Sequence, residues 1–116
     1  MVEDDPAVRT LIERALSREY TVETASDGMA GYVRLQKAPT PDLLICDIMM
    51  PGLDGLAVAK RARAADRTKQ MPIIFLTARA TPKDVIQGIQ SGARHYITKP
   101  FKLDDLMQKV RKVLAS

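Results

Sequence analysis

The sequence has no tryptophan and a single cysteine, Cys46, and aromatic residues make up only 4% of it. One cysteine cannot form an internal disulfide, which is typical of proteins in a reducing compartment, so we expect a cytoplasmic protein. No apolar run approaches the roughly 20 residues that a membrane span needs. The first residues also lack the charged-then-apolar pattern of a signal peptide. These absences argue against a disulfide-stabilised secreted scaffold and against a membrane protein.

Positive charge is in slight excess, and the formal net charge is +4. The basic residues gather mainly in 60–69 and 102–112. A basic stretch is one signature of nucleic-acid binding, but here no aromatic residues are interleaved and no recognition helix is evident. These basic residues are better explained as the solvent-exposed faces of helices. We therefore expect no direct contact of this domain with nucleic acid or membrane.

Short apolar runs alternate with longer segments of helical periodicity, and the 116 residues suit one domain spanning 1–116. The Asp5-Pro6 pair predicts the start of a helix, since aspartate caps helices and proline favours their first position. Further helices are predicted after 26–28, after 54–55, after 81–82 and over 103–114. Strands are predicted at 1–2, 20–24, 43–46, 73–76 and 96–98.

Strands that alternate with helices predict a parallel sheet with helices on both faces. The runs at 43–46 and 73–76 are continuously apolar, as in strands buried on both faces. Five strands and five helices predict an α/β, flavodoxin-like, doubly wound (βα)5 domain with strand order 2-1-3-4-5. In such a domain the functional crevice lies beyond the carboxyl ends of the strands.

Five polar side chains stand at the predicted carboxyl ends of four strands. Glu3 and Asp4 follow the first strand, Asp47 ends the third, Thr77 ends the fourth and Lys99 follows the fifth. These four strands are neighbours in the order 2-1-3-4-5. We therefore expect three carboxylates, one hydroxyl and one ammonium to meet in one crevice.

Such a cluster needs a cation, because two carboxylates about 4 Å apart repel by about 4 kcal/mol at an effective dielectric constant of roughly 20. Oxygen ligands without histidine or thiolate favour a hard cation, and Mg²⁺ fits best because it keeps waters that a phosphate can replace. A site with Mg²⁺, a lysine, a hydroxyl and a free carboxylate suits phosphoryl transfer. Asp47, in the middle, is the natural nucleophile.

With these residues in place, the chain resembles the CheY-like receiver domains of two-component response regulators along nearly its whole length. The matching segments are EDDP at 3–6, DIMMPG at 47–52 with DG at 54–55, LTAR at 76–79, GA at 92–93 and YITKPF at 96–101. Each is short, but five in order at the right separations are a specific signal.

The resemblance implies a role for each residue of the crevice. Asp47 is the phospho-acceptor, Asp4 is a direct Mg²⁺ ligand, Glu3 holds the ion largely through water, and Met49 contributes its backbone carbonyl. Lys99 pairs with the phosphoryl oxygens.

The resemblance also implies a switch. Thr77 hydrogen-bonds the phosphoryl group and Tyr96 moves inward behind it, which alters the face formed by the elements near 82–91, 96–98 and 103–114. The Lys99–Pro100 bond is expected to be cis, Ala78 is small enough to admit the phosphodonor, and Arg79 and Met49 flank the site.

The resemblance implies a signalling switch that a histidine kinase or phosphotransfer protein phosphorylates. The domain would catalyse its own phosphorylation and dephosphorylation without being a turnover enzyme. Its output would be an effector domain or a downstream protein, and the chain is either a stand-alone receiver or part of a longer regulator. A phosphorylation-dependent homodimer is one form of response, although Arg94 and His95 stand where winged-helix regulators carry acidic dimer residues.

Three alternatives are weaker. A pseudo-receiver, which binds partners without phosphorylation, would not need the complete set of Glu3, Asp4, Asp47, Thr77 and Lys99. A haloacid-dehalogenase-like phosphatase would need an acid two residues after Asp47, where Met49 stands. A flavodoxin-like flavin carrier would need a phosphate-binding loop after the first strand, where the acidic 3–5 segment would repel phosphate.

The chain departs from the pattern at its first strand. Only Met1 and Val2 precede the acidic pair, whereas a typical strand has about five or six residues. Each missing buried aliphatic side chain forgoes about 1.5–3 kcal/mol. We hypothesise a misassigned start, a trimmed chain or a shortened strand of reduced stability.

Overall fold

The computed structural model describes residues 1–77 and 95–115. The predicted helix after 81–82 lies outside the described residues, as do Ala78, Arg79, the GA pair at 92–93 and Arg94. Predictions that concern these positions therefore stay predictions.

Four helices and three strands make up the described part of the chain. In chain order they are α1 (Pro6–Leu16), α2 (Gly28–Leu35), β1 (Leu44–Asp47), α3 (Gly55–Ala64), β2 (Ile73–Thr77), β3 (His95–Thr98) and α5 (Leu103–Ala115).

Aspartates begin the first three helices. The Asp5 carboxylate accepts hydrogen bonds from the amides of Ala7 and Val8, and Asp27 and Asp54 cap α2 and α3 in the same way. Each cap satisfies amides that have no partner within the helix. The helix start predicted at Asp5-Pro6 is confirmed, and helices follow 26–28 and 54–55 as predicted.

The sheet is parallel and its neighbours follow the order β1-β2-β3. Val2 extends it on the other side, because Val2 forms parallel bridges with both Cys46 of β1 and Ala25. The lateral order in the sheet is therefore the segment around Ala25, then Val2, then β1, β2 and β3. This arrangement corresponds to the predicted order 2-1-3-4-5.

The predicted strand at 20–24 does not form, and only Ala25 pairs with the sheet. The Ala25 amide donates to the Met1 carbonyl (2.9 Å), and the Glu3 amide donates to the Ala25 carbonyl (3.1 Å). An edge strand needs a neighbour to satisfy its backbone groups. In this structure the neighbouring chain beside 20–25 consists of Met1 and Val2, which bond to Glu23 and Ala25, so the backbone at 20–22 has no strand to pair with in the described residues.

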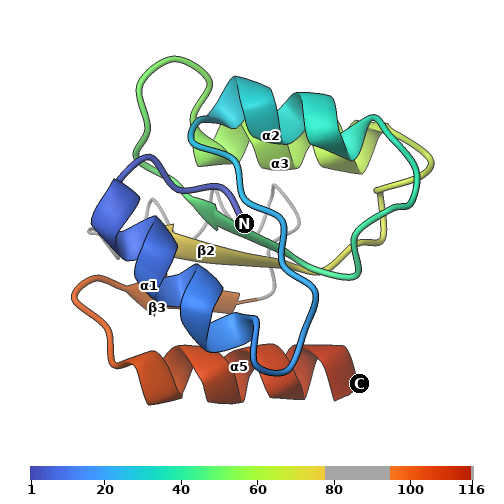
Figure 1. Cartoon of the computed structure of the whole chain (residues 1–116). Coiled ribbons are helices and arrows are strands. Elements are labelled where there is room, and N and C mark those ends of the chain that lie inside the picture. The colour runs from blue at the N-terminus through green and yellow to red at the C-terminus, as the bar shows by residue number, and fades with distance from the viewer. Residues whose placement is uncertain (78–94, 116) are drawn as a thin grey trace.

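Two hydrophobic cores cover the two faces of the sheet, with α2 and α3 on one face and α1 and α5 on the other (Figure 1). Phe75 packs in the first core, and Ile74 and Leu76 pack in the second. Every residue of β1 and β2 is buried, which explains their continuous apolar sequence. Cys46 is fully buried in the first core, and burial raises the pKa of its thiol.

None of the helices in the described ranges is long and apolar enough to cross a membrane.

Candidate functional site

The predicted polar residues stand at the carboxyl ends of the strands. Asp47 is the last residue of β1, Thr77 is the last residue of β2, and Lys99 directly follows β3. Glu3 and Asp4 follow Val2, which lies beside β1. Glu3, Asp47 and Thr77 are almost fully buried, whereas Asp4 is exposed.

Lys99 joins two of the carboxylates. Its Nζ lies 2.6 Å from Glu3 Oε1 and 2.9 Å from Asp47 Oδ2. The backbone fixes the start of this side chain, because the Lys99 amide donates to the Thr77 carbonyl at 2.7 Å. The peptide bond that follows, Lys99–Pro100, is cis as predicted. The structure thus brings the buried acids and Lys99 together, as the strand order predicts.

The other oxygens of the buried acids accept backbone hydrogen bonds. The Met49 amide donates to Asp47 Oδ1 (3.1 Å), and the Asp5 amide donates to Glu3 Oε2 (3.2 Å). These bonds fix both carboxylates in orientation. Met49 itself is 55% exposed. That the Met49 backbone carbonyl binds a metal ion stays a prediction.

Glu3, Asp4 and Asp47 form a compact group of carboxylates, each offering an oxygen within 4.8 Å of the others. Burial raises the pKa of Glu3 to about 7, and its hydrogen bond with Asp47 adds to the rise, which Lys99 partly offsets. Burial alone would lower the pKa of Lys99, but its contacts with Glu3 and Asp47 outweigh burial and raise it. One ammonium thus pairs with two carboxylates of a cluster of three, and the site attracts further positive charge.

Gly55 holds the start of α3 against the site. A Cβ at this position would lie 2.2 Å from the Asp47 carbonyl oxygen, so no larger residue fits without movement of the backbone. The Gly55 amide donates to the Ile48 carbonyl (3.0 Å). The Asp54-Gly55 pair therefore combines a helix cap with the close approach that positions the backbone of Asp47.

Tyr96 lies on β3, two residues before the position that pairs with Thr77 of β2. In the register of β2 and β3, Tyr96 pairs with Phe75 and Thr98 pairs with Thr77. The rings of Phe75 and Tyr96 lie 5.7 Å apart. Tyr96 therefore joins the core on the α2 and α3 side, and its role as a switch residue stays a prediction.

The sequence pattern did not indicate two residues that support the site. The Arg9 guanidinium donates to the Glu3 carbonyl (2.9 Å), and Lys109 Nζ donates to the Tyr96 carbonyl (2.9 Å). Both bind main-chain oxygens, which leave no signature in the sequence. Arg9 fixes the acidic segment from α1, and Lys109 links β3 to α5.

Comparison with known proteins finds relatives that are response regulators or transcriptional regulatory proteins. Residues 1–111 match the response regulator receiver domain family. The chain is 44% identical over 115 residues to the transcriptional regulatory protein AfsQ1 of Streptomyces coelicolor, covering 98% of this chain and 49% of that protein. It is 40% identical over 118 residues to RpaA of Synechocystis, a DNA-binding dual master transcriptional regulator, with 98% and 47% covered. The chain thus spans about half the length of the curated relatives it matches.

Solved structures give the same result. The chemotaxis protein CheY4 of Vibrio cholerae superposes with a TM-score of 0.90 at 32% identity, covering 97% of this chain and 93% of that chain. The receiver domain of a sensor histidine kinase from Pseudomonas aeruginosa, with a magnesium ion in its active site cleft, gives a TM-score of 0.87 at 34% identity, covering 99% and 94%. The sequence match, the fold and the cluster at the strand ends agree, and the chain belongs to the response regulator receiver domain family of two-component systems.

Proposed function

We propose that this domain is a cytoplasmic signalling switch that accepts a phosphoryl group on Asp47. The observation that carries the proposal is the position of Asp47, which is 4% exposed, paired with Lys99 and grouped with Glu3 and Asp4 at one end of the sheet. The donor is a phosphohistidine of a kinase or phosphotransfer protein. A carboxylate oxygen of Asp47 attacks the phosphorus, the new O–P bond forms as the P–N bond breaks, and the imidazole nitrogen takes up a proton.

The donor atoms of the acidic cluster fit a magnesium ion. All are carboxylate oxygens within 4.8 Å of one another, which suits a hard divalent cation. Glu3, Asp4 and Asp47 would hold the ion, together with the Met49 carbonyl. When bound, the ion supplies positive charge that neutralises the carboxylates and the phosphoryl oxygens.

Lys99 supplies a second positive charge. Its ammonium already lies against Asp47 Oδ2 at 2.9 Å, so it stands next to any group attached to that carboxylate. On phosphorylation Lys99 pairs with the phosphoryl oxygens, which are stronger acceptors than the carboxylate. The Thr77 hydroxyl, at the end of the adjacent strand, binds another phosphoryl oxygen. The domain modifies itself in this way and is not a turnover enzyme.

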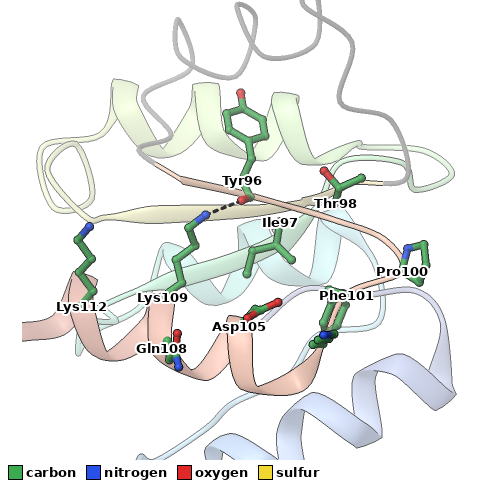
Figure 2. A pocket seen from close by; sticks show the side chains of 10 residues that line it. Tyr96, Ile97, Thr98, Pro100, Phe101, Asp105, Gln108, Lys109 and Lys112 are labelled. Carbon is green, nitrogen blue, oxygen red and sulfur yellow. Dashed lines mark hydrogen bonds between the residues drawn. The ribbon is translucent and has the colours of Figure 1, made fainter.

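The output passes through Tyr96 to the face formed by β3 and α5. A cavity of about 640 Å³ opens there, lined by residues of β3, α5 and the connection between them. Figure 2 shows Lys109 reaching from α5 to the Tyr96 carbonyl across this cavity. Movement of Tyr96 would change its shape, and an effector domain or downstream protein would read the change.

The proposal is tested by the intact mass of the protein after incubation with acetyl phosphate and Mg²⁺. We expect a gain of one phosphoryl group, which is lost in Asp47→Asn and after addition of EDTA. Asp42→Asn removes an exposed carboxylate and serves as the matched control. Far-UV circular dichroism verifies that each sample is folded.

Two outcomes would contradict the proposal. A folded protein that gains no phosphoryl group would favour the pseudo-receiver, which binds partners without modification. A gain that persists in Asp47→Asn would place the acceptor on another residue.

A further inference from the structure

The acidic segment 3–5 links the sheet to α1, and hydrogen bonds hold it at both ends (Figure 1). The Glu3 amide donates to the Ala25 carbonyl (3.1 Å), which ties the start of the segment to the sheet. The Asp5 carboxylate accepts from two amides in the first turn of α1, which ties its end to the helix. Asp4 lies between these two anchors and is exposed. Its position therefore depends on the two peptide groups that flank it.

Each of these two peptide groups has a hydrogen bond of its own. The Arg9 guanidinium donates from Nη1 to the Glu3 carbonyl (2.9 Å), which belongs to the Glu3–Asp4 peptide. The Asp5 amide, in the Asp4–Asp5 peptide, donates to Glu3 Oε2 (3.2 Å). Because a peptide group is planar, a bond to its oxygen or nitrogen also orients the adjoining Cα atoms. Arg9 thus orients Asp4 through the main chain.

Arg9 is itself held firmly. It is half-buried in α1, and its amide donates to the Asp5 carbonyl at 2.9 Å, so the helix fixes Arg9 relative to the acidic segment. Among the described residues, no carboxylate lies within ion-pair distance of the Arg9 guanidinium. The contact of Arg9 with the acidic segment is therefore a bond to the backbone and not the neutralisation of an acid.

The charge of Arg9 acts against the binding of a cation. A guanidinium stays protonated at ordinary pH, so it repels any divalent cation held by nearby carboxylates. If charge were its only effect, loss of Arg9 would strengthen the binding of Mg²⁺ and Ca²⁺ alike. Loss of positioning would instead weaken the binding of the ion that needs a fixed ligand. The two effects have opposite signs, so an experiment can separate them.

Mg²⁺ and Ca²⁺ differ in the ligand geometry that they need. Mg²⁺ requires a near-ideal octahedron of oxygens at about 2.0–2.1 Å, whereas Ca²⁺ accepts about six to eight oxygens at about 2.3–2.6 Å in flexible geometry. We propose that Arg9 is a positioning residue that holds Asp4 for Mg²⁺ and makes the acidic cluster prefer Mg²⁺ over Ca²⁺. This inference rests on the magnesium site proposed above.

The test titrates Mg²⁺ and Ca²⁺ separately into the parent chain and into Arg9→Met, which lacks the donor and the charge. Amide chemical shifts of Asp4 and Met49 give each Kd. We expect the Kd for Mg²⁺ to rise at least about fivefold, less than the roughly 10–100-fold for loss of a partner bonded directly to a ligand. The Kd for Ca²⁺ should change by less than about twofold, because Ca²⁺ tolerates a mobile carboxylate.

Two further variants control for charge. Arg9→Lys keeps the charge and a donor, and it should retain part of the preference for Mg²⁺. Arg14→Ala removes a charge from an exposed position of the same helix and should leave the preference unchanged. Urea unfolding in EDTA reports the stability of each metal-free chain, which a purely structural role would lower without changing the ratio of the two Kd values.

If Arg9→Met does not fold, Arg9→Gln replaces it with the same expected direction. Unchanged or tighter binding of Mg²⁺ in a folded variant, or an equal change for both ions, would overturn the role of Arg9 and leave the magnesium site in place. A folded parent chain that binds no Mg²⁺ would overturn the site and the role together.

Discussion

The ammonium of Lys99 lies 2.6 Å from the carboxylate of Glu3, although 96 positions separate the two residues in the sequence. This contact spans the sheet from Val2, which lies beside β1, to β3, because Glu3 follows Val2 and Lys99 follows β3. It also balances part of the negative charge that the fold concentrates at the strand ends. Several properties of the domain therefore depend on this pair.

Replacement of Lys99 by alanine should destabilise the domain in the absence of divalent cations. Loss of one partner from a buried ion pair costs about 3–5 kcal/mol, and because Lys99 is 23% exposed we expect about 1–3 kcal/mol. Urea unfolding at neutral pH in EDTA measures the change. Lys102→Ala, on an exposed lysine nearby, is the control. Equal stability of Lys99→Ala and the parent chain would show that water already screens the carboxylates.

The same variant should separate phosphorylation from response. Asp47 keeps its carboxylate in Lys99→Ala, so we expect partial phosphorylation by acetyl phosphate. The phosphorylated variant should not change its β3 and α5 face, because it lacks the ammonium that pairs with the phosphoryl oxygens. Amide chemical shifts of 95–115 with and without acetyl phosphate measure this response, and a full shift in the variant would contradict the assigned role.

The stability of the metal-free domain should fall as pH rises through the titration of Glu3. The pKa of Glu3 is about 7 in the folded chain against an ordinary value of 4.5, so the folded state binds the proton more tightly. The free energy of unfolding should therefore decrease between these two values, by about 2–3 kcal/mol. Glu3→Gln cannot ionise and should remove most of this dependence.

Urea unfolding in EDTA at several pH values measures this effect. Glu13→Gln changes a glutamate of α1 outside the acidic cluster and should retain the parent dependence. If Glu3→Gln and Glu13→Gln fall in stability equally as pH rises, another group is responsible.

Magnesium should stabilise the parent chain, and Asp4→Asn should lose this effect. Asp4 is exposed, so its replacement leaves no unpaired buried charge and separates metal binding from folding. A ligand at 100 times its Kd stabilises by about 2.7 kcal/mol. Thermal unfolding across a Mg²⁺ titration, with Asp42→Asn as the control, measures the difference. An equal rise of Tm in Asp4→Asn would remove Asp4 from the site.

Gly55→Ala should be more harmful than Gly52→Ala. The added Cβ at Gly55 would lie 2.2 Å from the Asp47 carbonyl oxygen, whereas Gly52 has open space and only a positive φ of 75°. Backbone displacement at Gly55 should cost about 1–3 kcal/mol and shift Asp47, and strain at Gly52 about 1–2 kcal/mol. Urea unfolding and the rate of phosphorylation by acetyl phosphate measure both effects. A normal rate in Gly55→Ala would show that α3 can move without Asp47.

The sequence predicts the features of this molecule that depend on local chemistry or on strand order. The Asp5-Pro6 pair and the turn segments at 26–28 and 54–55 predict helix starts, and the order 2-1-3-4-5 brings Glu3, Asp47 and Lys99 together from distant positions. The predicted strand at 20–24 does not form, because its residues have strand propensity but only Met1 and Val2 lie beside this segment as a pairing strand. The contact between Gly55 and the Asp47 carbonyl and the support of Glu3 by Arg9 depend on backbone positions, which no residue pattern records.

Thr77→Ala should uncouple Tyr96 from the phosphorylation of Asp47. Thr77 ends β2 beside Asp47 of β1, and Tyr96 lies on the adjacent strand, so loss of the hydroxyl removes the bond through which a phosphoryl group would draw Thr77 inward. Labelling the three tyrosines with fluorotyrosine gives one resonance each, and Tyr96→Phe assigns the one that reports the switch. Acetyl phosphate and Mg²⁺ should shift that resonance in the parent chain and in Thr77→Ser, which keeps the hydroxyl. In Thr77→Ala the intact mass should still rise by one phosphoryl group while the resonance stays in place, and a shift equal to that of the parent chain would show that Tyr96 responds through another contact.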